Sequence, residues 1–321
     1  MRVLITGGAG FIASHLADHL LEQGNSVVAL DDLSTGRHSN IEHLLGRPDF
    51  EFVLGSILNA DVVDDVVGRC EAVFHLAAAV GVQLIVNQPL RSLATNIRGS
   101  EIVFEKANKY GTRVLVTSSS EIYGKNRSDR LHEDDDRILG SPLKSRWAYS
   151  EAKAIDEILA YTYWREKGLS TVIVRLFNTV GPRQTGAYGM VIPRFVAQAL
   201  RNEPITIYGD GHQTRCFCYV GDIVRALAAL IEHPDAYGRV FNLGADEEIS
   251  VTDLAKMVRE ETGSSSELHY VAYEDAYEEG FEDMERRVPD TTRAKELVGF
   301  APTVGLRKII QLVIEEQSLA L

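Results

Sequence analysis

The sequence predicts an α/β protein with a doubly wound parallel sheet and a smaller α/β cap formed mainly by the C-terminal part. Three observations predict it. Short β-rich runs alternate with amphipathic segments through the first half, as in a parallel sheet covered on both faces. A glycine-rich run, "TGGAGFIASHL", lies directly after the first of these runs. After Asn178 the regular alternation stops, which indicates a second kind of structure.

The strands expected in the sheet are the β-rich runs of residues 2–6, 26–30, 50–55, 72–78, 112–119 and 170–178. Between them lie amphipathic segments such as "SEIVFEKANKYG", in which Ile102, Val103 and Ala107 fall on one side of a helix. The segment "RWAYSEAKAIDEILAYTYW" is a further strong helical pattern.

Beyond Asn178 the sequence predicts helices over 191–202, 220–234, 251–263 and 306–317, and strands over 205–209 and 239–244. The chain has no repeat and no obvious linker, so the two parts are expected to interleave and pack closely. The predicted sheet domain spans residues 1–178 with a return segment around 213–243. The cap takes residues 179–212 and 244–321.

The charge balance argues against nucleic acid and membrane surfaces as partners. Lys and Arg number 33 against 46 Asp and Glu, and the net charge of −13 repels phosphate groups. The apolar runs are much shorter than a bilayer span, and the N-terminus lacks a signal-peptide pattern, so a cytoplasmic protein is expected.

The cysteines predict buried thiols in a reducing compartment. Cys70, Cys216 and Cys218 are an odd number in a large chain. Cys216 and Cys218 would share one face of a strand, but a metal site needs further ligands, so we expect no metal.

The glycine-rich run fits a dinucleotide-binding turn. Gly8, Gly10 and Ala13 match G-x-G-x-x-[GA] between a predicted strand and helix. The first glycine permits the tight turn, the second lets a pyrophosphate approach the backbone, and the small Ala13 lets helix and strand pack closely. The helix N-terminus then presents free N–H groups to the pyrophosphate. This predicts a Rossmann domain.

An acidic residue at the end of the second strand supports this interpretation. Asp31 follows Gly8 at about the spacing at which a carboxylate accepts hydrogen bonds from the adenosine ribose. An anion there disfavours a 2′-phosphate, so NAD is predicted over NADP. The adjacent Asp32 has a simpler explanation as a solvated loop charge.

Two further groups predict chemistry. Tyr149 and Lys153 are four residues apart in a predicted helix, so the ammonium would lie on the same face as the phenol and lower its pKa. Such a phenol can act as a general base. The run "TSSSEIYG", residues 117–124, ends a core strand, at the edge where parallel sheets bind ligands.

Other stretches complete a pattern that runs almost from end to end. They include "DDLSTG", "VFHLAA", "NIRGSEIVFEKA", "RLFNTVGPR", "YGDGHQTRCFCYVGDIVRAL", "FNLG" and "RRVPDTTRAKELVGF". With the three groups above, the chain resembles the extended short-chain dehydrogenase/reductase family, in particular its NAD-dependent nucleotide-sugar epimerases, dehydratases and decarboxylases. One departure is "LGSI", where Ser56 replaces a carboxylate that relatives usually carry beside the adenine.

The resemblance implies a mechanism. Tyr149 would remove the proton from the sugar 4-hydroxyl while C4 passes a hydride to NAD. Lys153 would lower the pKa of Tyr149 and bind the nicotinamide ribose, and Ser119 would orient the 4-hydroxyl. The resulting 4-ketone acidifies C5 and makes loss of a carboxylate there feasible.

The resemblance also implies the binding residues. Cofactor contacts are expected from Gly7, Gly10, Phe11, Ile12, Asp31, Asp32, Ser34, Thr35, Gly36, Ser56, Ile57, Leu76, Ala77, Ala78, Asn96, Thr117, Tyr149 and Lys153. Substrate contacts are expected from Ser120, Asn178, Met190, Val191, Pro193, Arg215, Arg286 and Arg287. The three arginines resemble diphosphate ligands, and the position of Arg215 is also implicated in catalysis in decarboxylases. Residues 190–193 would pass the nucleobase.

Glu121 bears most directly on the reaction. The matching position is the C5 base in 4,6-dehydratases, is commonly small or neutral in 4-epimerases, and lies in a similar run in UDP-glucuronate decarboxylases. Ser120 replaces an acid of the thymidine-linked dehydratases. We therefore favour UDP-glucuronate decarboxylation, with 4-epimerisation of UDP-glucose or UDP-glucuronate close behind and 4,6-dehydration third. The bland alternative for Glu121 is a structural pair with Arg146 or Lys144.

Three further expectations follow. A protein that binds NAD without turnover is the alternative of another class, and intact Ser119, Tyr149 and Lys153 argue against it. Relatives commonly form homodimers through the helix bearing Tyr149 and the helix near 97–109. His75 lies in a buried-strand motif and is expected to be a satisfied core histidine, and no role is assigned to His212.

Overall fold

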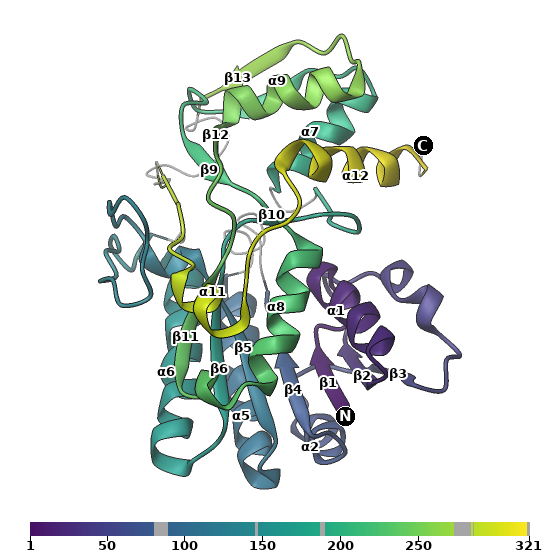
Figure 1. The fold of residues 1–321 in the computed structure, drawn as a ribbon, viewed down its shortest axis with the longest axis vertical. Coiled ribbons are helices and arrows are strands. Elements are labelled where there is room, and N and C mark those ends of the chain that lie inside the picture. Colours follow the sequence, from purple (N-terminus) through teal and green to yellow (C-terminus); the bar gives the residue numbers. More distant parts are fainter. Residues whose placement is uncertain (80–88, 145–146, 187–189, 273–283, 285, 320–321) are drawn as a thin grey trace.

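A seven-stranded parallel sheet lies at the centre of the larger part of the molecule, with strand order β11-β6-β5-β4-β1-β2-β3 (Figure 1). The computed structural model describes residues 1–79, 89–144, 147–186, 190–272, 284 and 286–319. The strands are β1 (Arg2–Thr6), β2 (Ser26–Asp31), β3 (Phe50–Leu54), β4 (Ala72–His75), β5 (Arg113–Ser119), β6 (Thr171–Leu176) and β11 (Arg239–Leu243). The predicted doubly wound α/β class is confirmed.

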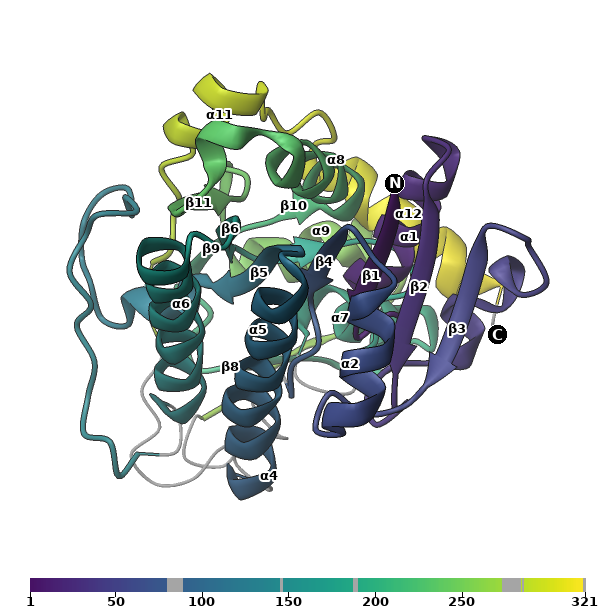
Figure 2. The same ribbon diagram turned by 90° about the horizontal axis from the view of Figure 1, so that it is seen from below.

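Helices cover both faces of this sheet, as Figure 2 shows. One face carries α1 (Phe11–Glu22), α8 (Val220–Glu232) and α11 (Thr292–Val298). The other carries α2 (Ala60–Gly68), α5 (Gly99–Tyr110) and α6 (Ala148–Lys167). Three of these helices, α5, α6 and α11, end at glycines in the left-handed conformation, Gly111, Gly168 and Gly299.

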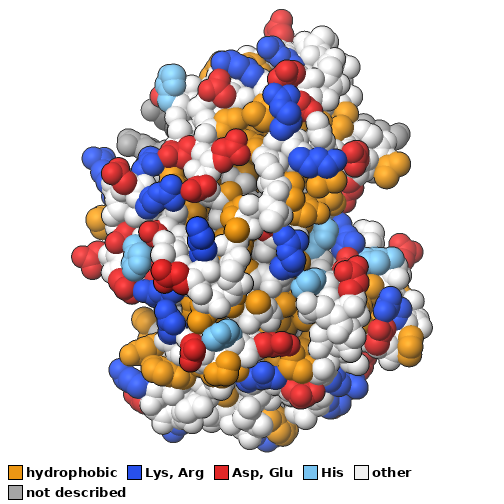
Figure 3. Space-filling view, in the orientation of Figure 1, with side chains coloured by type: hydrophobic (Ala, Val, Ile, Leu, Met, Phe, Trp, Pro, Cys, Tyr) orange, Lys and Arg blue, Asp and Glu red, His pale blue; other side chains and the backbone are white. Residues whose placement is uncertain are grey.

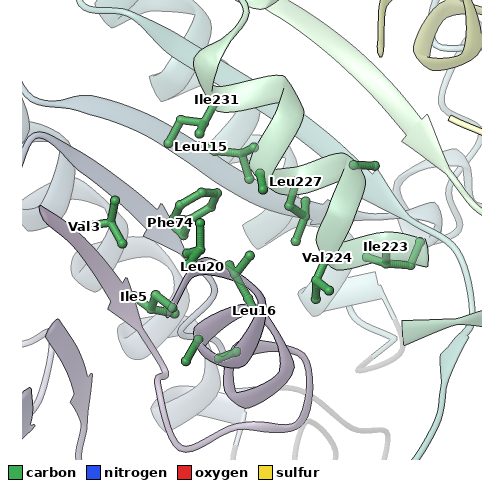
Figure 4. Packing of buried hydrophobic residues seen from close by; sticks show 14 of the residues in the cluster. Val3, Ile5, Leu16, Leu20, Phe74, Leu115, Ile223, Val224, Leu227 and Ile231 are labelled. Atoms are coloured by element: carbon green, nitrogen blue, oxygen red, sulfur yellow. The ribbon is translucent and has the colours of Figure 1, made fainter. Parts of the chain in front are cut away.

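The alternation along β1 explains why both faces are covered. Val3 and Ile5 belong to the apolar cluster under α1 and α8, whereas Leu4 belongs to the cluster under α2, α5 and α6. Figure 4 shows Leu16 of α1 and Leu227 of α8 packed over the first of these faces. A strand that is apolar on both sides needs helices on both sides.

The smaller part has an apolar core of its own, to which α7 (Val191–Leu200), α9 (Val251–Thr262) and α12 (Leu306–Ser318) contribute. It lies at the top of Figure 1. Three two-stranded sheets complete it. Their strands are β7 (Thr179–Val180) with β10 (Cys218–Tyr219), β8 (Ile205–Tyr208) with β13 (Leu268–Val271), and β9 (Thr214–Cys216) with β12 (Glu248–Ser250).

The predicted return segment divides between the two parts. Its α8 and β11 lie with the large sheet, whereas its β9 pairs with β12 in the smaller part. Cys216 and Cys218 do not share one strand as predicted, because Phe217 separates β9 from β10. The prediction that the three cysteines are buried free thiols is confirmed.

Short helical turns connect these elements. They are η1 (His38–Asn40), η2 (Glu42–Leu44), α4 (Pro89–Leu93), the π-helical η3 (Ala94–Arg98), η4 (Ser120–Tyr123) and η6 (Pro234–Ala236). Within the described ranges, no helix combines the length and the apolar character that crossing a membrane requires. Acidic and basic side chains intermingle over the face seen in Figure 3.

Candidate active site

A cavity of about 530 Å³ lies between the carboxyl ends of the sheet strands and the smaller part. Its walls come from the segments that follow β1, β2, β4, β5 and β6, together with α7, β8 and β9. This is the edge at which open parallel sheets bind ligands. Residues of both parts of the molecule therefore face one space.

The glycine-rich turn forms the floor of one end of the cavity. Gly7 has φ +69°, and a Cβ there would lie 2.9 Å from the Cα of Ala77. A Cβ on Gly8 would lie 2.5 Å from the Cβ of Ala29. The left-handed turn therefore depends on Gly7, and Gly8 provides close packing on β2, which corrects the predicted role of Gly8.

The N-terminus of α1 opens onto this turn. Gly10 is the capping residue, and no side chain accepts the first N–H groups of the helix. Phe11, Ile12 and Ala13 line the cavity at this point. Because the first-turn N–H groups have no intrahelical acceptors, they are available to an anion.

Asp31 ends β2 at the cavity wall. Its carboxylate accepts the N–H of Ala9 at 3.0 Å and that of Leu33 at 2.7 Å. Burial raises the pKa of Asp31, and these two donors act in the opposite direction. The neighbouring Asp32 is exposed at the rim, as a loop charge is expected to be.

Several other predicted cofactor positions line the same cavity: Gly7, Gly10, Ser34, Thr35, Ile57, Leu76, Ala77, Ala78 and Thr117. Gly36, Ser56 and Asn96 are not part of the lining. Asn96 is buried and bonds both the N–H and the carbonyl of Ala79, so it holds the segment after β4 in place. A Cβ on Gly36 would lie 2.8 Å from Oδ2 of Asp31.

Tyr149 and Lys153 lie on one buried face of α6. Nζ of Lys153 is 6.0 Å from the centre of the Tyr149 ring, and it donates to the carbonyl of Thr117 at 2.9 Å. Tyr149 is hydrogen-bonded to Ser119 at the end of β5. Ser119, Tyr149 and Lys153 therefore all lie at the cavity.

The pKa of Tyr149 corrects one expectation. Burial raises it above the usual value and outweighs Lys153, which acts to lower it. Lys153 itself donates to Oδ2 of Asp156 at 3.0 Å. Burial favours the neutral amine of Lys153, but Asp156 and Tyr149 hold its pKa above the usual value. Sequence reasoning missed Asp156, although it lies three residues after Lys153 on the helix.

Glu121 is held in η4 by an arginine from the far end of the chain. Oε1 of Glu121 accepts from Nη1 of Arg287 at 2.7 Å, and Oγ of Ser120 lies 3.3 Å from the same nitrogen. Arg287 was not among the partners expected for Glu121. Arg146, which was, lies outside the described residues.

The three predicted substrate arginines are placed differently. Arg215 and Arg287 line the cavity and are largely buried. Arg286 is not part of the lining, because Glu248 holds its guanidinium at 2.6 and 2.9 Å on the surface. The remaining predicted substrate positions lie in the cavity wall: Ser120, Asn178, Met190, Val191 and Pro193.

Sequence reasoning missed other residues of the lining. Among the polar ones are Arg91, Thr95, Gln184, Thr185, Arg194, Tyr208 and Gln213. Gln184 and Thr185 follow the carboxyl end of β6 in the "GPRQT" loop, a position that could have suggested them. The others reach the cavity from elements whose orientation depends on tertiary packing.

His75 is a satisfied core histidine, as expected. It is fully buried, with Nδ1 2.7 Å from Oγ1 of Thr6 and Nε2 3.0 Å from Oγ of Ser100. Burial lowers its pKa to about 3.

Comparison with known proteins identifies the group to which this site belongs. Residues 3–244 match the model of a family described as "NAD dependent epimerase/dehydratase family". The chain belongs to that family. It is therefore an NAD-dependent enzyme of nucleotide-sugar metabolism.

Two curated members are similar over nearly the whole chain. One is a UDP-N-acetyl-alpha-D-glucosaminuronate decarboxylase from Bacillus cytotoxicus, 39% identical over 315 residues and covering 97% of each chain. The other is UDP-glucuronic acid decarboxylase 1 of Xenopus tropicalis, 35% identical over 98% of this chain and 72% of that protein. A solved member, a UDP-glucose 4-epimerase from Thermotoga maritima with UDP-glucose, is 33% identical with a TM-score of 0.90, covering 100% and 99% of the chains.

The residues of this family member fit NAD. A Cβ on Gly7 would clash with the backbone of Ala77 and a Cβ on Gly10 with the carbonyl of Gly7, so the turn requires both glycines. The N-terminus of α1, where Gly10 is the capping residue, suits the pyrophosphate. Asp31 suits an adenosine ribose without a 2′-phosphate. The predicted cofactor is confirmed by the family.

Proposed function

We propose that the protein decarboxylates UDP-glucuronate, with a UDP-sugar 4-epimerase as the second candidate. The observation that carries the proposal is the carboxylate of Glu121, which lines the cavity beside Tyr149 and Ser120. A simple 4-epimerase has no use for a carboxylate there. Both curated relatives are named as decarboxylases of a UDP-linked uronate, and the Xenopus tropicalis relative is named for UDP-glucuronic acid, which supports the proposal.

The first step is oxidation at C4 of the sugar. NAD, when bound, would supply the hydride acceptor for C4. Tyr149 takes the proton of the 4-hydroxyl, with Ser119 sharing a hydrogen bond with the phenol. Lys153 and Ser119 both favour the phenolate, against burial, and Asp156 keeps Lys153 charged.

The second step uses the ketone. A 4-ketone is β to the carboxylate on C5, so the electrons of the breaking carbon–carbon bond pass to the ketone oxygen as carbon dioxide leaves. C5 then takes up a proton. Glu121 is our candidate to carry that proton, and the buried guanidinium of Arg215 is our candidate to hold the uronate carboxylate.

Epimerisation needs fewer groups. Ser119, Tyr149 and Lys153 suffice for oxidation and reduction at C4. Between these two steps the 4-keto sugar has only to rotate so that its opposite face is reduced. The likeness to the Thermotoga maritima epimerase favours this second candidate.

Proton NMR of the NAD-loaded protein with UDP-glucuronate tests the proposal. We expect loss of the hexuronate anomeric signal, new signals of a UDP-pentose or UDP-4-keto-pentose, and released carbon dioxide. UDP-N-acetylglucosaminuronate is the second substrate to try, because it is in the name of the Bacillus cytotoxicus relative. Exchange between UDP-glucose and UDP-galactose with all carbon retained would instead establish the 4-epimerase.

Glu121→Gln separates the two candidates further. It should lower decarboxylation by a hundredfold or more, roughly the contribution of one general acid or base. A 4-epimerase should stay largely active.

We also propose a homodimer through α5 and α6. Ile158, Tyr161 and Trp164 of α6 are 62, 42 and 37% exposed, an unusual run of large apolar side chains for a surface. Of the neighbouring apolar residues of α6, Ile155 is half-buried and Leu159 packs against the core. Light scattering should give a mass of two chains for the parent protein and of one chain for Ile158→Asp.

A further inference from the structure

The pair between Glu121 and Arg287 joins two groups with different expected duties. Glu121 is the proposed proton carrier, and Arg287 lies at the cavity wall where a substrate anion would bind. Nη1 of Arg287 lies 2.7 Å from Oε1 of Glu121, and the two side chains are 10 and 15% exposed. Glu121 and Arg287 are therefore ion-pair partners of each other in this structure.

The guanidinium of Arg287 has donors to spare. Among the described residues its hydrogen bonds all come from Nη1, to Ser120 and Glu121. Its Nε is buried and has no acceptor. A buried N–H group without an acceptor is costly and uncommon, so the site is incomplete without a further anion or acceptor. An oxyanion that takes two parallel N–H bonds is the usual partner of a free guanidinium edge.

We propose that Arg287 is shared between Glu121 and an oxyanion of the substrate, so that binding of the oxyanion releases Glu121 for proton transfer. This rests on the proposed function. Arg287 carries one positive charge, so an oxyanion on its free Nε edge weakens the attraction that holds Glu121, and the two anions compete for that charge. Before substrate binds, Arg287 holds the Glu121 carboxylate in an ion pair. When the substrate oxyanion binds Arg287, Glu121 becomes available for proton transfer.

The competition predicts a measurable coupling. The affinity for UDP is measured by calorimetric titration of the NAD-loaded protein. It should increase about fivefold in Glu121→Gln, because the ligand no longer competes with a carboxylate for Arg287. In an Arg287→Gln background the same Glu121→Gln change should leave the affinity within twofold. NAD affinity should be equal in all four proteins, which verifies that each is folded.

A matched control lies one residue away. Arg286 is held by Glu248 in a pair of similar length, but this pair is on the surface outside the cavity. Glu248→Gln should therefore leave UDP affinity within twofold.

Comparing UDP with UDP-glucuronate shows which substrate group supplies the oxyanion. A gain with UDP indicates the diphosphate, whereas a gain only with UDP-glucuronate, titrated in a Tyr149→Phe background that does not turn it over, indicates the sugar carboxylate. No gain with either ligand would overturn the proposal, as would a gain that persists without Arg287. Affinity is read without turnover, so the coupling is decided even if no carbon dioxide is released.

Discussion

Two arginine–glutamate pairs flank the short turn η4 and differ in how completely the guanidinium is used. Arg175 of β6 donates to both oxygens of Glu157 at 2.9 and 2.8 Å, and its third nitrogen donates to Tyr123 and to the carbonyl of Glu133. Within the part of the chain that the structure describes, Arg287 donates from Nη1 alone and its Nε has no acceptor.

The difference in hydrogen bonding suggests that the Arg175 pair has a structural role and the Arg287 pair a role in ligand binding. All three guanidinium nitrogens of Arg175 donate, and Tyr123 extends the network by donating to Asn242 at 2.7 Å. None of these three side chains lines the cavity. It ties α6, β6, η4 and β11 together beneath the cavity. The cavity wall instead carries groups whose bonding capacity is only partly met. We therefore expect the Arg175 cluster to contribute mainly to stability and Arg287 mainly to ligand binding.

The largest expected effect is the loss of turnover when Tyr149 in the cavity wall is changed. Tyr149→Phe removes the proposed base, so turnover of UDP-glucuronate should fall by about 10²- to 10⁴-fold in the NMR assay. The free energy of unfolding should change by less than about 1 kcal/mol, because the change removes only a buried hydroxyl. Full turnover in the variant would contradict both the mechanism and this side of the comparison.

The counterpart beneath the cavity is Glu157→Gln. It leaves the buried charge of Arg175 without a counter-charge, so urea unfolding should show a loss of roughly 3 kcal/mol. Turnover per folded molecule should stay within threefold of the parent. Glu121→Gln is the matched change at the other pair. It also leaves a buried guanidinium without its carboxylate and should cost stability, but there turnover should fall as well.

A pH titration of stability sharpens the comparison. His75 titrates near 6.5 in the unfolded chain, but burial lowers its pKa to about 3 in the folded protein. Between these values the unfolded state binds one more proton, so the free energy of unfolding falls as the pH falls, by up to about 1.4 kcal/mol per pH unit.

His75→Gln should remove that contribution. The slope of unfolding free energy against pH between 4 and 6 should be shallower in the variant by about that amount. Equal slopes would show that His75 does not remain neutral in the folded protein.

The smallest effect is expected at the surface pair. The Arg286 side chain is 42% exposed and that of Glu248 31%. Glu248→Gln should therefore change the free energy of unfolding by less than about 1 kcal/mol in the same urea experiment. A loss as large as that of Glu157→Gln would remove the distinction between closed buried pairs and exposed ones.

The sequence predicts most of what is local. The strands, the helix bearing Tyr149 and Lys153, and the carboxylate of Asp31 depend on spacing along one element or one turn. The division between Gly7 and Gly8 was not predictable at this level, because it depends on which of two neighbouring glycines faces Ala77 and which faces Ala29.

The long-range pairings could not be predicted. Glu121 and Arg287 are 166 positions apart, and nothing near either residue indicates the other. Arg286 and Arg287 are adjacent and identical, so only the packed structure shows that one meets Glu248 and the other the cavity. The pKa of Tyr149 likewise depends on burial, which the Tyr-x-x-x-Lys spacing does not contain.

The position of β11 has a consequence for the newly made chain. It completes the sheet beside β6, yet β6 ends at Leu176 and β11 begins at Arg239, after much of the smaller part. During synthesis β6 is thus an unpaired sheet edge until the ribosome has released residue 243, and such an edge is open to strand addition from other chains. Fragments that stop before Arg239 should aggregate, and chaperones should engage the chain over this interval.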